Sequence, residues 1–165
     1  MQEGTVIKMI SVGISDWKIV TPPDTLVTYA LGSCVGICLY DKMNKIAGLS
    51  HIMLPDSQNH ETSETGRMKF ADTAIPDMLN KMIKMGAIKS TIKAKIAGGA
   101  IMFKLANDRF NIGERNVVAV KATLQSLRIP VLAQDTGKDY GRTMIVNATD
   151  GSVIIKSANR GAWNL

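Results

Sequence analysis

Cysteine is scarce in this sequence, which contains Cys34 and Cys38 and no other thiol. That is far below the cysteine content of a disulfide-stapled secreted domain. On one extended strand, the step from Cys34 to Cys38 would span roughly 13 Å, whereas disulfide-bonded Cα atoms lie within roughly 7 Å. We therefore predict two free thiols.

Metal ligands are equally sparse. The chain has two histidines, His51 and His60, and a structural zinc ion needs a full tetrahedral set of nitrogen or sulfur ligands. The spacing of these histidines and the two cysteines matches no zinc finger or ribbon. We predict that the protein binds no metal, and no pattern in the sequence indicates an organic cofactor.

Long hydrophobic runs are also missing, and none approaches the roughly 18 residues of a membrane span. The opening stretch MQEGTVIKMISVG contains an acidic residue and too short an apolar run for a signal peptide. We therefore expect a cytoplasmic protein without membrane insertion.

Basic charge is spread out rather than clustered. The net charge is +6, lysines are scattered along the chain, and aromatic residues make up only 5%. Nucleic-acid-binding faces usually combine a dense basic patch with stacking aromatics. We predict no nucleic-acid partner, whereas a positive surface would favour an acidic protein partner.

What is present fits a soluble globular chain, with 45% hydrophobic residues and a length that suits one domain over residues 1–165. Short apolar runs bounded by turn residues predict strands at 11–20, 25–32, 35–41, 46–54, 91–100, 131–137, 142–148 and 152–156, with a hairpin turn at 148–151. Because most strands follow one another without an intervening helix, we predict an α+β fold with mostly antiparallel or mixed sheets and two main helices.

The first predicted helix spans residues 70–83, where apolar residues recur at helical spacing. Ser63 or Thr65 would cap its start, and Gly86 would end it. Pro76 inside the pattern should kink or restart the helix. The methionines of this region are interpreted as core residues rather than as a binding stripe. They are Met68, Met78, Met82 and Met85.

The second predicted helix spans residues 113–128 and has its own apolar face. Pro130 stops it.

Cys34 is the candidate nucleophile. It follows the letters LGS at the end of one predicted strand and opens the next, and glycine permits a turn there that other residues resist. A thiol on such a turn can share its space with its own backbone N–H, as an oxyanion hole requires. Cys38, between Ile37 and Leu39, is interpreted as a buried small apolar residue. An unreactive core cysteine remains the alternative for Cys34.

His51 is the candidate base. If 35–41 and 46–54 form a hairpin centred on the turn at 43–44, residue 34 faces about residue 53, so His51 lies within a residue or two of Cys34. An adjacent imidazolium would favour the reactive thiolate. His60 lies in a polar loop and is expected to be exposed. A hydrogen-bonded core histidine remains the alternative for His51.

A third group should hold the imidazole in one tautomer. The candidates near the pair are Thr28, Ser33 and Ser50, with Asp24 further away. We favour Thr28, whose hydroxyl would accept the imidazole N–H from a neighbouring strand.

Several motifs occur in one order along most of the chain: TYALGSCVGICLYD, AGLSHIMLP, GGAIMF, IGERN and DTGKDYGR. Together they resemble the CheD family of chemoreceptor glutamine deamidases. The resemblance implies a layered α/β/β sandwich, with Cys34, His51 and Thr28 as catalytic residues. It also implies that the protein hydrolyses selected glutamine side chains on methyl-accepting chemotaxis receptors to glutamate. The implied partners are these receptors and a CheC-type phosphatase, which competes with receptors for CheD.

Two details of these motifs bear on specificity. In DTGKDYGR, Lys138 stands where a second glycine usually follows Gly137 in the family. In GGAIMF, Gly98 and Gly99 end a strand before the possible anchors Met102 and Phe103. We predict that Ser33, Gly98, Gly99 and Phe103 line the substrate or partner groove, the alternative being a tight strand-to-helix corner.

Two other functions remain open. The protein could be chiefly a receptor-binding or CheC-binding regulatory module with weak or dispensable catalysis. It could also be a cysteine peptidase, because GSC also surrounds papain-type nucleophiles. Loss or retention of deamidation in Cys34→Ala separates the binding module from the enzyme.

Overall fold

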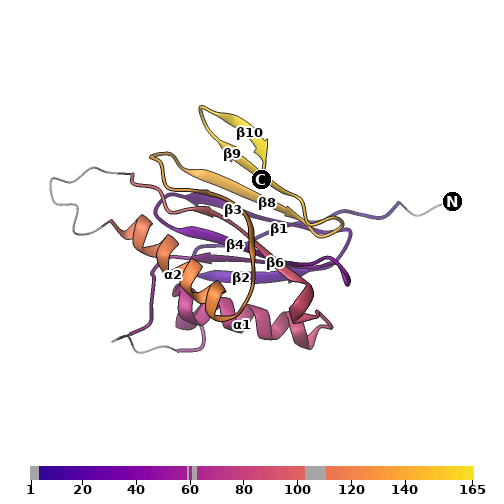
Figure 1. Ribbon diagram of the computed structural model, residues 1–165. Helices are drawn as coiled ribbons and strands as arrows, with labels where there is room; N and C mark the ends of the chain where they lie inside the picture. Colours follow the sequence, from indigo (N-terminus) through magenta and orange to yellow (C-terminus); the bar gives the residue numbers. More distant parts are fainter. Residues whose placement is uncertain (1–3, 59, 61–62, 103–110) are drawn as a thin grey trace.

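The computed structural model describes residues 4–58, 60, 63–102 and 111–165, which form three layers: two helices, a middle sheet and an outer sheet (Figure 1). The helices are α1 (Ala71–Lys84) and α2 (Ile112–Ser126), and single 3₁₀ turns lie at Gly66–Lys69 (η1) and Lys89–Thr91 (η2). This arrangement confirms the predicted layered α+β sandwich with two main helices.

The middle sheet lies between the other two layers and has five strands. Their order across the sheet is β2 (Asp16–Val20), β5 (Ile46–Ile52), β4 (Val35–Asp41), β6 (Ile92–Gly98) and β7 (Val131–Thr136).

The outer sheet also has five strands. Their order is β1 (Met9–Ser11), β3 (Thr25–Leu31), β8 (Arg142–Asn147), β9 (Val153–Ser157) and β10 (Gly161–Asn164). The pairs β1–β3 and β6–β7 are parallel and the others are antiparallel, so both sheets are mixed, as predicted.

Two apolar cores hold the layers together. The helix-side core lies between the helices and the middle sheet and includes Ile37, Leu39, Ile52, Met78 and Met82. The inter-sheet core lies between the two sheets and includes Leu26, Leu31, Cys38, Leu49 and Met144. Because side chains alternate along a strand, β4 and β5 supply both cores and are buried on both faces.

Asp41 fixes the hairpin that joins β4 to β5. Its fully buried carboxylate accepts hydrogen bonds from the backbone N–H of Met43 (2.9 Å) and the side-chain amide of Asn44 (2.9 Å) inside the turn. It also accepts from the Ile88 N–H (2.8 Å) and the Thr91 hydroxyl (2.7 Å), which lie at the η2 turn far along the sequence. Burial raises the pKa of Asp41, but these donors outweigh it and bring the pKa down to about 2. The turn, and with it the hairpin register, is therefore firmly set.

Helix α1 lies within one residue of the predicted range 70–83 at each end, but the residue that precedes its start is not a predicted cap. Phe70 is the N-cap residue, in an extended conformation without a side-chain cap, so the predicted Ser63 or Thr65 cap is wrong. The Ser63 hydroxyl instead accepts from the N–H of Gly66 (3.1 Å), the first residue of the preceding 3₁₀ turn. Pro76 lies inside the helix without dividing it, because packing of the buried face onto the middle sheet outweighs one lost backbone bond. Gly86, with φ of 108°, follows the helix end as predicted.

The methionine prediction holds for two of the four residues. Met78 and Met82 are fully buried in the helix-side core, whereas Met85 is 43% exposed and Met68 is half-buried.

Helix α2 begins one residue before the predicted start and ends two residues before the predicted end. The Asn111 side chain caps it by accepting from Glu114 N–H (3.1 Å). Arg128, with φ of 58°, lies just past the helix end.

The segment 11–20 differs from the single strand predicted for it. Strand β1 ends at Ser11 in the outer sheet, and β2 begins at Asp16 in the middle sheet. Ser15, with φ of 59°, lies in the turn that carries the chain between the sheets. Strand β10 was not predicted, because its four residues show no apolar alternation. The hairpin turn at 148–151 is confirmed between β8 and β9.

Candidate active site

The hairpin of β4 and β5 brings Cys34 and His51 to the same end of the middle sheet. Val35 pairs with Ile52 and Gly36 pairs with His51, so Cys34, just before β4, stands opposite Met53. This is the register predicted from the turn. Alternate residues share a face, so Cys34 and His51 are diagonal neighbours facing the outer sheet.

Gly36 pairs with His51 and lies two residues after Cys34 on the same face, where Met144 and Leu31 of the outer sheet pack closely against it. A Cβ atom at Gly36 would come within 2.9 Å of the Met144 sulfur and 3.1 Å of Leu31 Cδ1. The position therefore has little room for a side chain.

Thr28 reaches His51 from the outer sheet. Its hydroxyl oxygen lies 2.7 Å from His51 Nδ1 and 2.7 Å from the carbonyl oxygen of Val12. The hydroxyl has one hydrogen, and the Val12 carbonyl can only accept, so Thr28 donates to Val12 and accepts from Nδ1–H. This assignment leaves Nε2 of His51 without a hydrogen, as a general base requires.

The Nε2 atom is buried and has no hydrogen-bond partner among the described residues. Within the ranges that the structure describes, the His51 ring has no hydrogen bond to Ser33, Ser50 or Asp24, the other orienting candidates. Ser50 is the neighbour of His51 on β5 and so points to the opposite face, and Asp24 accepts from Lys8 N–H (3.1 Å). His60 is exposed as predicted, and its ring lies 5.0 Å from that of Phe70.

Burial keeps both members of the pair neutral. It lowers the pKa of His51 from 6.5 to about 4. It also raises the pKa of the half-buried Cys34 thiol, and the backbone N–H of Cys34 itself only partly opposes this. At neutral pH both directions favour a protonated Cys34 thiol and a neutral His51 imidazole.

The buried imidazole makes stability depend on pH. Above pH 6.5, His51 is neutral in both the folded and the unfolded chain. As the pH falls from 6.5 toward about 4, the unfolded chain binds a proton that the folded chain does not, so the free energy of unfolding decreases. The full decrease from His51 is on the order of 3 kcal/mol.

Urea unfolding of wild type and His51→Gln at neutral pH and at about pH 4.5 measures this contribution. We expect the wild type to lose more stability on acidification than the variant. Equal losses would contradict a neutral buried His51.

The backbone of Cys34 rests on the end of β6. Gly99 N–H donates to the Cys34 carbonyl (2.8 Å), and Ala100 N–H donates to the Gly32 carbonyl (2.8 Å). Gly98 has φ of 112°, and a Cβ atom there would overlap the Cys34 carbonyl oxygen. Gly98 and Gly99 therefore let one chain segment lie directly against another, which accounts for both glycines as a tight corner. Their contact with substrate stays a prediction.

The amino-acid sequence was compared with known proteins. The family model described as CheD chemotactic sensory transduction matches residues 53–157. The chain belongs to the CheD family. It is 47% identical over 155 residues to a Halalkalibacterium halodurans protein named chemoreceptor glutamine deamidase CheD, covering 93% of this chain and 96% of that one.

Two relatives named probable chemoreceptor glutamine deamidase CheD are similarly close. The protein of Clostridium acetobutylicum is 49% identical over 163 residues, with 98% of each chain covered. The protein of Lachnoclostridium phytofermentans is 48% identical over 155 residues, with 93% of this chain and 96% of that one covered. The matches thus extend across the segments that carry Thr28, Cys34 and His51.

The structure shows how Lys138 and the GGAIMF segment, the two motif features that bear on specificity, are placed in this CheD-family chain. Lys138 has φ of 63°, a backbone conformation that favours glycine, so the loop keeps a glycine-like shape despite the lysine. The Lys138 carbonyl accepts from Ile101 N–H (2.8 Å). Met102 is 45% exposed and its side chain lies over Gly32, while Phe103 falls outside the described residues. Ser33 is half-buried next to Cys34.

Sequence reasoning missed one side chain near the pair. Asn116 of α2 is fully buried, and its Nδ2 donates to the carbonyls of Ser33 (2.9 Å) and Met53 (3.0 Å). The available signal was a polar residue within the IGERN motif, on the helix side that faces the core.

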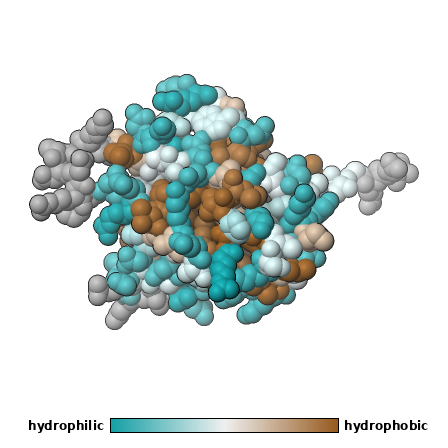
Figure 2. Space-filling view, in the orientation of Figure 1, coloured by the Kyte–Doolittle hydropathy of each residue, from teal (hydrophilic) through white to brown (hydrophobic). Residues whose placement is uncertain are grey.

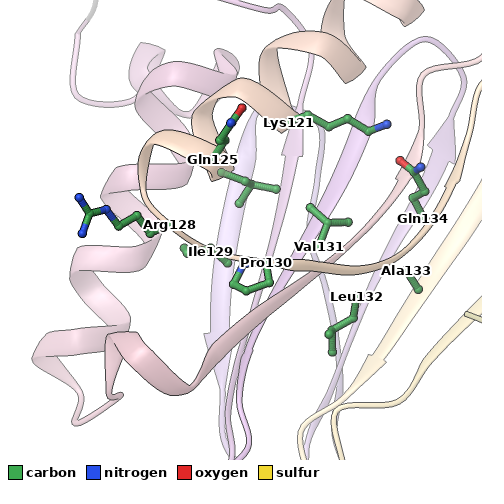
Figure 3. A pocket seen from close by; sticks show the side chains of 10 residues that line it. Lys121, Gln125, Arg128, Ile129, Pro130, Val131, Leu132, Ala133 and Gln134 are labelled. Atoms are coloured by element: carbon green, nitrogen blue, oxygen red, sulfur yellow. The ribbon is translucent and has the colours of Figure 1, made fainter.

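A groove between α2 and β7 lies apart from these residues (Figure 3). Lys121, Gln125 and Arg128 border it on the helix side, and Val131 to Gln134 border it on the strand side. Figure 2 shows apolar side chains at the centre of the face that carries it. None of its lining residues belongs to the candidate site.

In the described part of the chain, no helix is long and apolar enough to span a membrane.

Proposed function

We propose that this chain hydrolyses the side-chain amide of selected chemoreceptor glutamines to glutamate and releases ammonia. Cys34 is the nucleophile, His51 is the general base and acid, and Thr28 orients the imidazole. The observation that carries the proposal is the hydrogen bond between Thr28 and His51 Nδ1, which leaves Nε2 free on the face shared with Cys34. Membership of the CheD family, whose curated relatives are named as glutamine deamidases, supports the substrate class.

The first half of the reaction forms a thioester. Nε2 of His51 takes the thiol proton while the Cys34 sulfur attacks the amide carbon of the glutamine side chain. The amide oxygen becomes an oxyanion, and the backbone N–H of Cys34, which lies beside its own thiol, is a donor for it. Thr28 keeps accepting from Nδ1–H, so the imidazolium stays in place.

Burial then favours the departure of ammonia. A pKa of about 4 makes the His51 imidazolium a strong acid in this setting. It gives its proton to the amide nitrogen, the carbon–nitrogen bond breaks, and the acyl group stays on sulfur. Neutral His51 next takes a proton from water as the water oxygen attacks the thioester carbon. The carbon–sulfur bond breaks, Cys34 regains a proton, and a glutamate carboxylate remains.

An apolar rim of Met53, Ile101 and Met102 lies on the chain segments that adjoin Cys34, with the Met102 side chain over Gly32. These side chains are 43%, 40% and 45% exposed, and Met53 stands opposite Cys34 in the hairpin. Methionine adapts to irregular apolar surfaces, so the rim suits a folded protein as substrate. We propose that it contacts the receptor, together with Ser33, and that a CheC-type phosphatase competes for it.

Mass spectrometry of a receptor fragment tests the proposed function. We expect peptides with selected glutamines to gain the amide-to-acid mass increment, with one ammonia released for each. Unchanged glutamine peptides would contradict the proposal. Cleavage of the backbone with intact side-chain amides would identify a cysteine peptidase instead.

Two substitutions of Thr28 are expected to lower kcat to different degrees. Thr28→Val removes the acceptor for Nδ1–H while keeping the shape of the side chain, so the imidazole loses its fixed tautomer. We expect kcat to fall about tenfold to a hundredfold, as loss of one buried hydrogen bond implies. Thr28→Ser keeps the hydroxyl and should retain most of the activity. Equal activity of Thr28→Val and wild type would remove Thr28 from the mechanism.

A further inference from the structure

Asn116 links the two strands that carry the reactive pair. Its Nδ2 donates one hydrogen to the Ser33 carbonyl and the other to the Met53 carbonyl. Ser33 directly precedes Cys34, and Met53 stands opposite Cys34, one step beyond the last strand pair of Val35 and Ile52. The amide thus bridges the open end of the hairpin.

The other hydrogen bonds of the two strand ends go to different parts of the chain. On one side, the Cys34 carbonyl accepts from Gly99 N–H (2.8 Å) at the end of β6. On the other side, Met53 N–H donates to the Lys69 carbonyl (2.9 Å) in η1. These partners lie in separate parts of the chain, so by themselves they do not fix the width of the hairpin at Cys34. The Asn116 amide bonds to both ends at once.

A primary amide suits this bridge because it supplies two hydrogens without burying a charge. Both targets are carbonyl oxygens, which accept and cannot donate, and the amide NH₂ group supplies two hydrogens from one atom. An aspartate would present oxygens to both carbonyls, and an apolar residue would leave both carbonyls without this donor. Asn116 is fully buried, so water does not replace it readily.

We propose that Asn116 is a positioning residue that holds Cys34 at the distance from His51 needed for proton transfer. It acts through the backbone of Ser33 and Met53 and does not touch substrate. The inference rests on the proposed function, because it concerns the same Cys34–His51 pair.

The matched control is Val120, one helical turn further along α2. Val120 is also fully buried, but it packs in the helix-side core and is apolar. Val120→Ala therefore destabilises the same helix without removing a bond to the hairpin. Asn116→Leu removes the bridge with a side chain of similar size. Asn116→Ser, which donates a single hydrogen, replaces it if the leucine variant does not fold.

Two readouts separate positioning from folding. One is the rate of iodoacetamide alkylation of Cys34 as a function of pH, mapped by mass spectrometry on the intact folded protein. The other is the separation of kcat from KM for deamidation of the receptor fragment. Both are measured well below the melting temperature of every variant, and His51→Ala gives the level without the base.

We expect Asn116→Leu to lower kcat about tenfold to a hundredfold with little change in KM, and to move the alkylation profile toward that of His51→Ala. Val120→Ala should keep the wild-type kcat and alkylation profile. The serine variant should fall between wild type and the leucine variant.

Wild-type kcat and alkylation in the Asn116 variants would overturn the inference, and so would an equal loss of both in Val120→Ala. Failure of the proposed function looks different. In that case, His51→Ala itself would leave Cys34 alkylation and deamidation unchanged.

Discussion

Cys34→Ala is expected to lower the rate of receptor deamidation at least about a thousandfold, because the variant has no atom that can form the thioester. The substitution should not disturb the fold. The contacts that hold this segment, from Gly99 N–H to the Cys34 carbonyl and from Asn116 to the Ser33 carbonyl, use backbone atoms that alanine retains. Mass spectrometry of the receptor fragment measures the loss, and circular dichroism checks the fold.

Cys38→Ala is the matched control. Cys38 lies four residues along the same hairpin, is 1% exposed, and belongs to the inter-sheet core. Burial raises the pKa of its thiol to about 12, so it stays protonated and unreactive at neutral pH. The control variant should keep its activity. Deamidation by Cys34→Ala at the wild-type rate would refute the nucleophile, and normal signalling by that variant would favour a binding module.

His51→Ala should produce the second largest loss, about a hundredfold to ten-thousandfold in kcat. The raised pKa of Cys34 makes a base necessary, because little thiolate exists at neutral pH without one. The activity of the wild type should also fall as the pH drops through about 4, where His51 binds a proton and no longer acts as a base.

His60→Ala is the control for this variant. His60 is exposed in the polar loop and should be replaceable without effect on deamidation. Steady-state kinetics of both variants with the receptor fragment make the comparison. A His51→Ala enzyme with wild-type kcat would show that another group removes the thiol proton.

The hairpin register could be predicted from the sequence because it is local. The turn residues between β4 and β5 place Cys34 opposite Met53 by simple counting, and the Asp41 carboxylate holds that turn. The contact between Thr28 and His51 could be anticipated for a similar reason, since the Thr28 strand lies close in sequence and few other hydroxyls were available, while the catalytic role of Thr28 stays a prediction.

The remaining features depend on contacts between distant parts of the chain. Asn116 meets Ser33 across 83 positions and Met53 across 63 positions, and no local pattern specifies such a meeting. The pKa shifts of Cys34 and His51 are a second example, because they depend on burial in the folded protein and the spacing of the two residues does not reveal it. The division of 11–20 between two sheets was hidden for the same reason, since apolar alternation does not reveal which sheet a strand joins.

The candidate site lies where the three layers meet. Thr28 comes from the outer sheet, Cys34 and His51 come from the middle sheet, and Asn116 comes from the helix layer. A chain that has formed the hairpin but not yet packed it therefore has a thiol without an oriented base. Catalytic competence would then require all three layers to be packed, and recovery of activity after dilution from denaturant would report their docking.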